Sequence, residues 1–299
     1  MTVDIYSALA VTVRFLAFTI PVVVIASAAT SVMIRRGLMN RLALLASPIL
    51  ERLHVGHVVA TSAAVCFISA TASYSMLAQA LKDRVIDERE VIAASFINSF
   101  PSSVSHTYRF FIPFVIPILG WTGVVYTALR MLVAVTKSVI GVAMAAKWST
   151  NSRMAQAVKS HTPHTSFTLV KRTGVMMFIT YFSVQIATQL GVFDIASSFF
   201  SFLPVEPSII AIATIELVST KAAIVTGSGM LESGGISVKW LLVALMLGNV
   251  ITLSTGYVKH SLPFHVSLFG RLGVKIVALN AIVSLVLDAM VIAGVILLL

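Results

Sequence analysis

The chain contains few of the residues on which soluble and secreted proteins depend. Only 11% of its 299 residues are charged, with 11 acidic residues against 21 Lys and Arg, and Cys66 is its single cysteine. The chain has too few charged residues to form the polar surface of a large soluble domain. One cysteine excludes an internal disulfide and a multi-cysteine metal cage.

The motifs of common enzyme classes are also missing. The sequence has no Gly-rich phosphate loop and no His-Glu-x-x-His zinc pair. Its serines and histidines form no recognisable nucleophile arrangement. We therefore expect no catalytic residues, no resident metal and no bound cofactor beyond a coupling ion, either Na⁺ or a proton.

Apolar residues dominate what is present. They make up 58% of the chain, and the mean hydropathy is +0.98. Residues 15–33, 124–146 and 276–299 each provide the roughly 20 apolar residues that cross a bilayer. The net charge of +10 lies in short clusters between apolar segments, which is typical of cytoplasmic loops rather than of nucleic-acid binding. We predict an integral protein of the cell membrane that contacts lipids and a small solute but no nucleic acid. A homo-oligomer is left open.

The chain repeats itself at an interval of 150 residues. Residues 86–129 align with residues 236–279 without a gap, and chance does not place a proline, two glycines and two cations in one frame. The pairs are Ile86 and Ile236, Ala94 and Ala244, Pro113 and Pro263, Phe114 and Phe264, Gly120 and Gly270, Gly123 and Gly273, Leu129 and Leu279, Arg89 and Lys239, and Arg109 and Lys259. Internal duplication is a common way to build a transporter. We divide the chain into a first repeat (1–147), a polar linker (148–170) and a second repeat (171–299).

Residues 56–82 are long enough to span a membrane but are polar in the middle. One interpretation is a spanning helix whose hydroxyls bond to its own backbone. The other is a re-entrant hairpin, in which irregular backbone at membrane depth faces protein or a water-filled cavity. The hairpin keeps the basic clusters at 35–52 and 147–172 on one side, as the positive-inside rule favours, whereas eight full spans separate them.

The predicted fold is therefore an all-α polytopic membrane protein made of two inverted-topology repeats. Each repeat has three spanning helices and one re-entrant helical hairpin, at 56–82 in the first and 206–231 in the second. Both termini are predicted outside and the 148–170 linker in the cytoplasm.

Polar residues at membrane depth form four clusters that the repeat pairs. Each such residue is costly in a bilayer and so is often functional. A single hydroxyl can simply join two helices, but matched clusters beside Pro101 and Gly256 favour a substrate site near the midplane. The candidate substrate-binding residues are Ser69, Thr71 and Ser73; Asn98, Ser99 and Ser102; Ser219, Thr220 and Lys221; and Asn249, Thr252 and Ser254.

Other ionisable residues at membrane depth have two or more alternative roles. Glu216 and His106 are candidates for a coupling ion, although Glu216 could instead neutralise Lys221, and a membrane histidine is more often a satisfied donor. The fourth segments of the two repeats hold Arg130, Lys137, Asn280 and Asp288. Asp288 could pair with a cation inside the bundle, which the sequence alone does not identify.

Several stretches resemble one known family. They are Phe67-Ile68-Ser69-Ala70-Thr71-Ala72, Leu81 to Ile86, Ser95 to Phe100 and Arg109 to Pro113, and in the second copy Ser219 to Gly227 and Leu231 to Ile236. They resemble the nucleoside-recognition, or gate, family, whose module occurs in concentrative nucleoside transporters, ferrous-iron transporter B and spore-maturation proteins A and B. The resemblance implies a transport-related membrane protein whose hairpins line the pathway, without fixing a substrate.

The chain departs from the iron transporter in this family. The gate cysteines of that protein would fall near Ser69 and residues 100–102, where this chain has none, and Thr220-Lys221-Ala222 lacks the Glu of its Ala-Lys-Glu-like hairpin turn. Thiolate ligation of iron is therefore not expected, while oxygen and imidazole ligands remain open. Our leading hypothesis is a secondary transporter of a small polar solute, with a nucleoside as one candidate. The alternatives are a non-transporting scaffold or lipid-handling protein of the spore-maturation type, and a divalent-metal transporter without cysteine ligands.

Overall fold

A computed structural model describes residues 55–148, 206–256 and 261–299, together with short runs and single positions at 4–53 and 178–190. Across these residues every regular element is a helix, which confirms the predicted all-α class. Apart from Trp148, the linker at 148–170 lies outside the described residues, as does most of the first span of each repeat.

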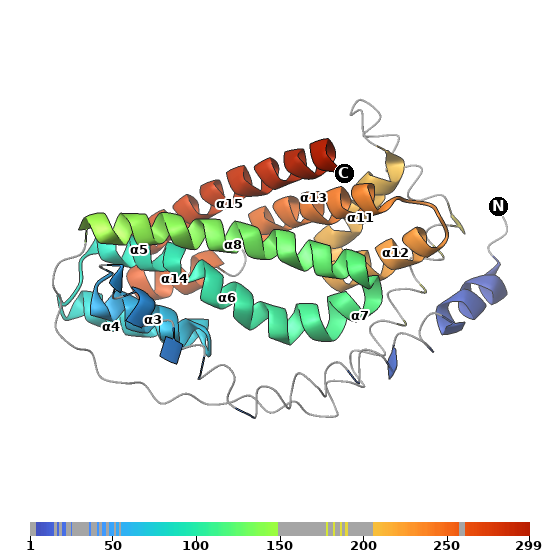
Figure 1. Cartoon of the computed structure of the whole chain (residues 1–299). Helices are drawn as coiled ribbons and strands as arrows, with labels where there is room; N and C mark the ends of the chain where they lie inside the picture. Colours follow the sequence, from blue (N-terminus) through green and yellow to red (C-terminus); the bar gives the residue numbers. More distant parts are fainter. Residues whose placement is uncertain are drawn as a thin grey trace.

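The first half of the chain begins with a pair of short helices (Figure 1). These are α3 (His57–Cys66) and α4 (Ala70–Lys82). An interrupted helical path follows, consisting of α5 (Glu88–Ile97), α6 (Ser99–His106), the π-helix η1 (Thr107–Val115) and α7 (Ile116–Leu119). The half ends in the long helix α8 (Trp121–Trp148).

The second half contains the same kinds of element. Its helix pair is α11 (Pro207–Val218) and α12 (Thr220–Glu232), and α13 (Val238–Gly256) is continuous where the first half changes from α5 to α6. The last two helices are α14 (Leu262–Phe269) and α15 (Arg271–Leu298). The bounds of α4 and α8 become those of α12 and α15 when 150 is added to each residue number.

Local geometry recurs at the same interval. Ser69 and Ser219 are extended residues whose hydroxyls accept the backbone N–H of Ala72 and Ala222, at 3.2 and 3.3 Å. Such N-caps satisfy an amide that the first helical turn leaves without a partner. Gly120 and Gly270 have φ of +58° and +57°, a left-handed conformation that favours glycine. The matched glycines therefore mark equivalent sharp turns.

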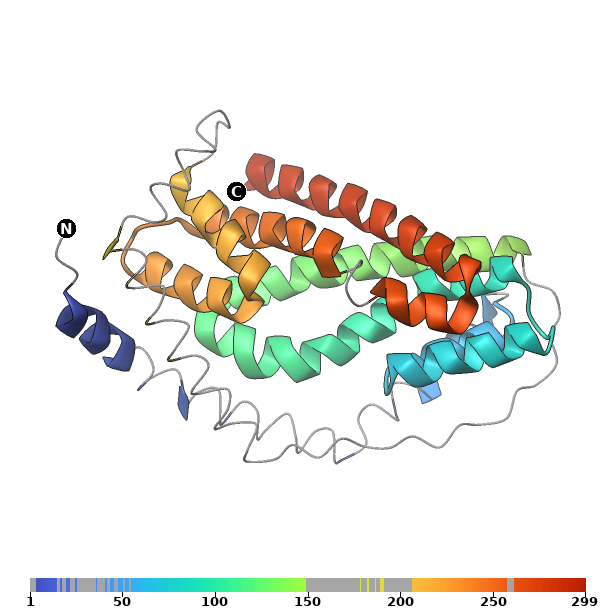
Figure 2. The same ribbon diagram turned by 180° about the vertical axis from the view of Figure 1, so that it is seen from behind.

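The long helices α8 and α15 contact each other and run in opposite directions (Figures 1 and 2). Two apolar cores form around them. The first packs α3, α4 and α5 against Phe269, Leu272 and Ile276 of the second half. The other packs α11, α12 and α13 against η1 and α7 of the first half. Each helix pair thus packs against the opposite half of the chain.

Within the described residues, α8 and α15 are the two helices long and apolar enough to cross a membrane. Each has 28 residues, a length of about 42 Å at 1.5 Å per residue, against roughly 30 Å for the hydrocarbon core. The helices of the two short pairs have 10 to 13 residues, too few to cross. A re-entrant path for these pairs, and an inverted relation between the halves, stay predictions.

Candidate functional site

A cavity of about 380 Å³ lies where α4, α5, α6 and α8 of the first half meet α14 and α15 of the second. Its size is within the usual range for small-molecule sites. Its walls are polar, although the protein is mostly apolar. The polar and charged residues that line it are Thr71, Ser95, Asn98, Ser99, Ser102, Ser103, Arg130, Lys137, Ser261, His265, Asn280, Ser284 and Asp288.

The predicted substrate-binding residues of the first half lie in or beside this cavity. Thr71, Asn98, Ser99 and Ser102 line it. Ser69 is the N-cap of α4. Ser73 is buried and links two helices, because it accepts from the side-chain amide of Asn98 at 3.0 Å and donates to the carbonyl of Ser62 at 2.8 Å.

The predicted residues of the second half lie elsewhere. Ser219 caps α12, and neither it, Thr220 nor Lys221 lines the cavity. The Lys221 ammonium lies 5.4 Å from the ring centroid of Phe114. Asn249 contacts a cavity residue, Asp288. Thr252 and Ser254 belong to α13, but their side chains are outside the described residues.

The two candidates for a coupling ion do not line the cavity either. His106 packs against the rings of Phe110 and Phe111, with centroids 5.1 and 5.4 Å away. Glu216 is buried, and a Cβ atom placed on Gly248 would lie 2.9 Å from the Glu216 Cβ. Glycine at 248 thus makes room for this buried carboxyl group.

Pro101 explains why the helix is interrupted between α5 and α6, beside the cavity. In a regular helix the carbonyl of Ile97 would accept the N–H of residue 101, which proline lacks. The Ser138 hydroxyl of α8 supplies the missing hydrogen, donating to the Ile97 carbonyl at 2.7 Å, and accepts the Phe100 N–H at 2.9 Å. Side-chain bonds of this kind allow an interrupted helix to exist inside a membrane protein. They also fix Asn98, at the break, beside the cavity.

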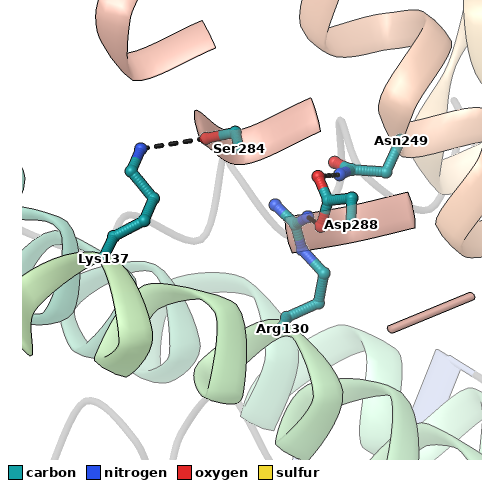
Figure 3. A network of polar contacts seen from close by, with 5 residues as sticks. All are labelled: Arg130, Lys137, Asn249, Ser284 and Asp288. Carbon is teal, nitrogen blue, oxygen red and sulfur yellow. Dashed lines mark hydrogen bonds and ion pairs between the residues drawn. The ribbon is translucent and has the colours of Figure 1, made fainter. Parts of the chain in front are cut away.

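A row of polar contacts joins the facing sides of α8 and α15 (Figure 3). Arg130 forms an ion pair with Asp288 at 3.4 Å, and Lys137 donates to the Ser284 hydroxyl at 2.9 Å. The second carboxylate oxygen of Asp288 accepts from the Asn249 amide at 3.4 Å. One turn away from Ser284, the Asn280 amide donates to Ser95 of α5 at 2.9 Å. The contacts of Asp288 with Arg130, of Ser284 with Lys137 and of Asn280 with Ser95 connect the two halves directly.

Sequence reasoning named Arg130, Lys137, Asn280 and Asp288 but not their partners, and it missed Ser284. A spacing of four residues places Asn280, Ser284 and Asp288 on one face of a helix. Seven residues separate Arg130 from Lys137, which also places these two on a common face. This helical spacing in both segments could have predicted that the two helices face each other through polar side chains.

An aromatic cluster lines the cavity between α4 and α14. The Tyr74 ring lies 4.7 Å from the His265 ring and 6.0 Å from that of Phe264, both in edge-on contacts. A ring nitrogen of His265 lies 2.8 Å from the Ser261 carbonyl, which fixes the imidazole. His265 is a further cavity residue that the sequence did not single out.

The charges of the cavity are not balanced. Two basic side chains, Arg130 and Lys137, accompany one acidic side chain, Asp288. Asp288 is fully buried, while the Arg130 side chain is 26% exposed. In the described part of the chain, no group of three or more His, Cys, Asp or Glu side chains is arranged to hold a metal ion. The arrangement offers hydroxyl, amide and cationic donors to a polar solute.

Comparison with known proteins gives a family match over the first half. The Gate family, described as nucleoside recognition, matches residues 16–122, which confirms the resemblance seen in the sequence. An uncharacterised protein of Methanocaldococcus jannaschii is 42% identical over 277 residues, 87% of each chain. Two further uncharacterised proteins of that organism are 25% identical over 76% of this chain and 79% of theirs, and 17% identical over 94% and 95%. No solved structure matches.

Proposed function

The chain belongs to the nucleoside-recognition family, and from this premise we propose that it is a membrane transporter that moves a small polar solute through the cavity between its two halves. The family occurs in nucleoside transporters and related membrane proteins. A nucleoside is therefore one candidate solute.

The observation that carries this proposal is the position of the cavity. Helices from both halves line it, and its walls gather polar and charged side chains inside a chain that is 58% apolar. Polar groups inside a membrane protein are costly and usually face a pathway or a partner. In transporters with internal repeats, the substrate site lies at the interface of the repeats, beside interrupted helices. The Pro101 break beside Asn98 fits that description.

The transporter would be polytopic, with two inverted repeats at 1–147 and 171–299 and a cytoplasmic linker at 148–170. The opposite directions of α8 and α15 support the inversion. The short helices of the two pairs support re-entrant hairpins, because 13 residues cover only about 20 Å. Each repeat would then contribute three spanning helices and one hairpin.

Transport would require the cavity to open to each side in turn. The contacts of Arg130 with Asp288 and of Lys137 with Ser284 join α8 to α15. A rocking motion of one half against the other would break and re-form them, and a bound solute would replace part of their bonding. Thr71, Asn98, Ser99 and Ser102 would contact the solute from the first half, and Asn280 and Asp288 from the second.

Uptake into proteoliposomes tests the proposal. The purified protein is reconstituted and offered labelled adenosine, uridine, acetate and AMP in turn. We expect uptake of at least one solute, reduced several-fold by Asn98→Ala and unchanged by Ser233→Ala, an exposed serine at the end of α12. Folded protein in sealed vesicles that transports none of them would favour the scaffold or lipid-handling alternative.

A further inference from the structure

Lys137 is a buried cation with an incomplete set of partners. Its side chain is 6% exposed, although it lines the cavity. The ammonium donates to the neutral hydroxyl of Ser284 at 2.9 Å and lies 5.8 Å from the ring centroid of Phe96. No described carboxylate forms an ion pair with it. An ammonium has three donor hydrogens, so this environment satisfies it only in part.

The Asp288 carboxylate attracts Lys137 but forms its ion pair with Arg130. Asp288 is the one carboxylate among the lining residues. Arg130 binds one of its oxygens and Asn249 the other. The remaining polar lining consists of serine and threonine hydroxyls, the Asn98 and Asn280 amides and the His265 imidazole, none of which is an anion. The cavity therefore carries an excess positive charge centred on Lys137.

Burying a charge without a counter-charge is costly, and proteins normally pair such groups. A buried charge that lowers stability is usually retained because the protein's function requires it. We propose that the transported solute carries an anionic group, a carboxylate or a phosphate, that binds the Lys137 ammonium. The proposal rests on the proposed transport function and narrows its substrate class.

The surroundings of Lys137 fit an oxyanion. The Ser284 hydroxyl lies at hydrogen-bond distance from the Lys137 ammonium, and Asn280 lies one helical turn before Ser284 on α15. The Asn280 amide already donates to Ser95 and to the Ile276 carbonyl, so the Lys137 ammonium and the neighbouring hydroxyls are the groups that would share the oxygens of a carboxylate or phosphate. Asp288 lies one turn beyond Ser284 and also lines the cavity, where its carboxylate suits a neutral or cationic part of the solute.

Matched ligands test the charge requirement. Binding to the detergent-purified full chain is measured by calorimetry for AMP against adenosine and for acetate against acetamide, with inorganic phosphate as a fifth probe. Acetate and acetamide have similar shapes, AMP adds a phosphate group to adenosine, and in each pair only one member carries the anion. We expect the anion to bind more tightly in at least one pair, and the pair that responds separates phosphate from carboxylate.

Lys137→Met tests the residue, because methionine retains much of the length and loses the charge. We expect anion affinity to fall on the order of ten- to a hundred-fold, as for a lost charge-assisted hydrogen bond. The ligand-free variant should melt at a higher temperature than the native protein, because an unpaired buried charge is removed. The matched control is Lys275→Met, an exposed lysine of α15, which should leave anion affinity unchanged.

The outcomes separate this inference from the transport function. If adenosine or acetamide binds and is taken up as well as its anionic partner, and Lys137→Met leaves both unchanged, the substrate class is wrong and transport stands. If Lys137→Met lowers the melting temperature or prevents folding, the lysine is structural and the inference is overturned. If no probe binds or enters vesicles, both proposals fail.

Discussion

The guanidinium of Arg130 and the carboxylate of Asp288 lie 3.4 Å apart, although 158 residues separate them in the chain. Arg130 belongs to α8 and Asp288 to α15, so the pair joins the two halves at the wall of the cavity. The carboxylate is fully buried and also accepts from Asn249 of α13. Three helices thus meet at one carboxyl group.

Replacing Asp288 by Asn should destabilise the protein. The substitution preserves shape but leaves the partly buried guanidinium of Arg130 without its counter-charge. Removing one partner of a buried pair costs about 3 kcal/mol, which unfolding in mixed detergent–SDS micelles would measure. Arg130→Met together with Asp288→Asn should lose less stability than the two single changes added. Strict additivity would contradict a direct pair.

Replacing Ser138 by Ala should weaken the interrupted helix. The change removes the hydroxyl that bonds the Ile97 carbonyl and the Phe100 amide, at a cost of about 1–3 kcal/mol in unfolding free energy. The loss should be smaller in a Pro101→Ala background, because alanine restores the N–H that the Ile97 carbonyl lacks. An equal loss in both backgrounds would show that Ser138 does not compensate for the proline.

Gly248→Ala should be destabilising by about 1–3 kcal/mol, because its new methyl group would overlap Glu216. Gly294→Ala is the matched control on α15, where nothing lies within 4 Å of the added carbon. That variant should be neutral or up to about 1 kcal/mol more stable, since alanine is the better helix former. Similar stability of the two variants would argue against close packing of α13 on Glu216.

The two hairpin residues Thr71 and Lys221 should differ in their effect on solute binding. They are equivalent in the duplication, but only Thr71 lines the cavity. Thr71→Ala should lower the affinity for a transported solute by several-fold, and Lys221→Ala should leave it unchanged, as measured by calorimetry. Equal losses would indicate a symmetric site that includes both hairpin tips.

Much of the architecture could be predicted because the duplication marks residues that fix local geometry. Gly120 and Gly270 repeat since both turns need a positive φ, and the bounds of α4 and α12 agree because equivalent serines cap them. Hydrophobic composition was sufficient to predict the helical class. These features depend on short stretches of sequence, which pattern analysis describes well.

The site was harder to predict for two physical reasons. A hydroxyl beside a helix break can cap the helix, as Ser69 does, or face a cavity, as Ser102 does, and both roles favour the same residue type. The partner of Asp288 depends on the packing of two helices distant in sequence. The second copy has also diverged, with Gly248 in the place of Asn98. A prediction that assumes two equivalent copies therefore assigns too many cavity residues to the second repeat.

Access to the cavity is the most direct test of the account. Ser102→Cys places a thiol in the cavity wall. The native protein, whose single cysteine Cys66 is fully buried, measures the background labelling. The variant in sealed proteoliposomes is treated with a charged, membrane-impermeant thiol reagent from either side. We predict labelling from both sides, slowed by a solute that the protein takes up. Labelling from one side only, or labelling unaffected by a transported solute, would contradict transport through this cavity.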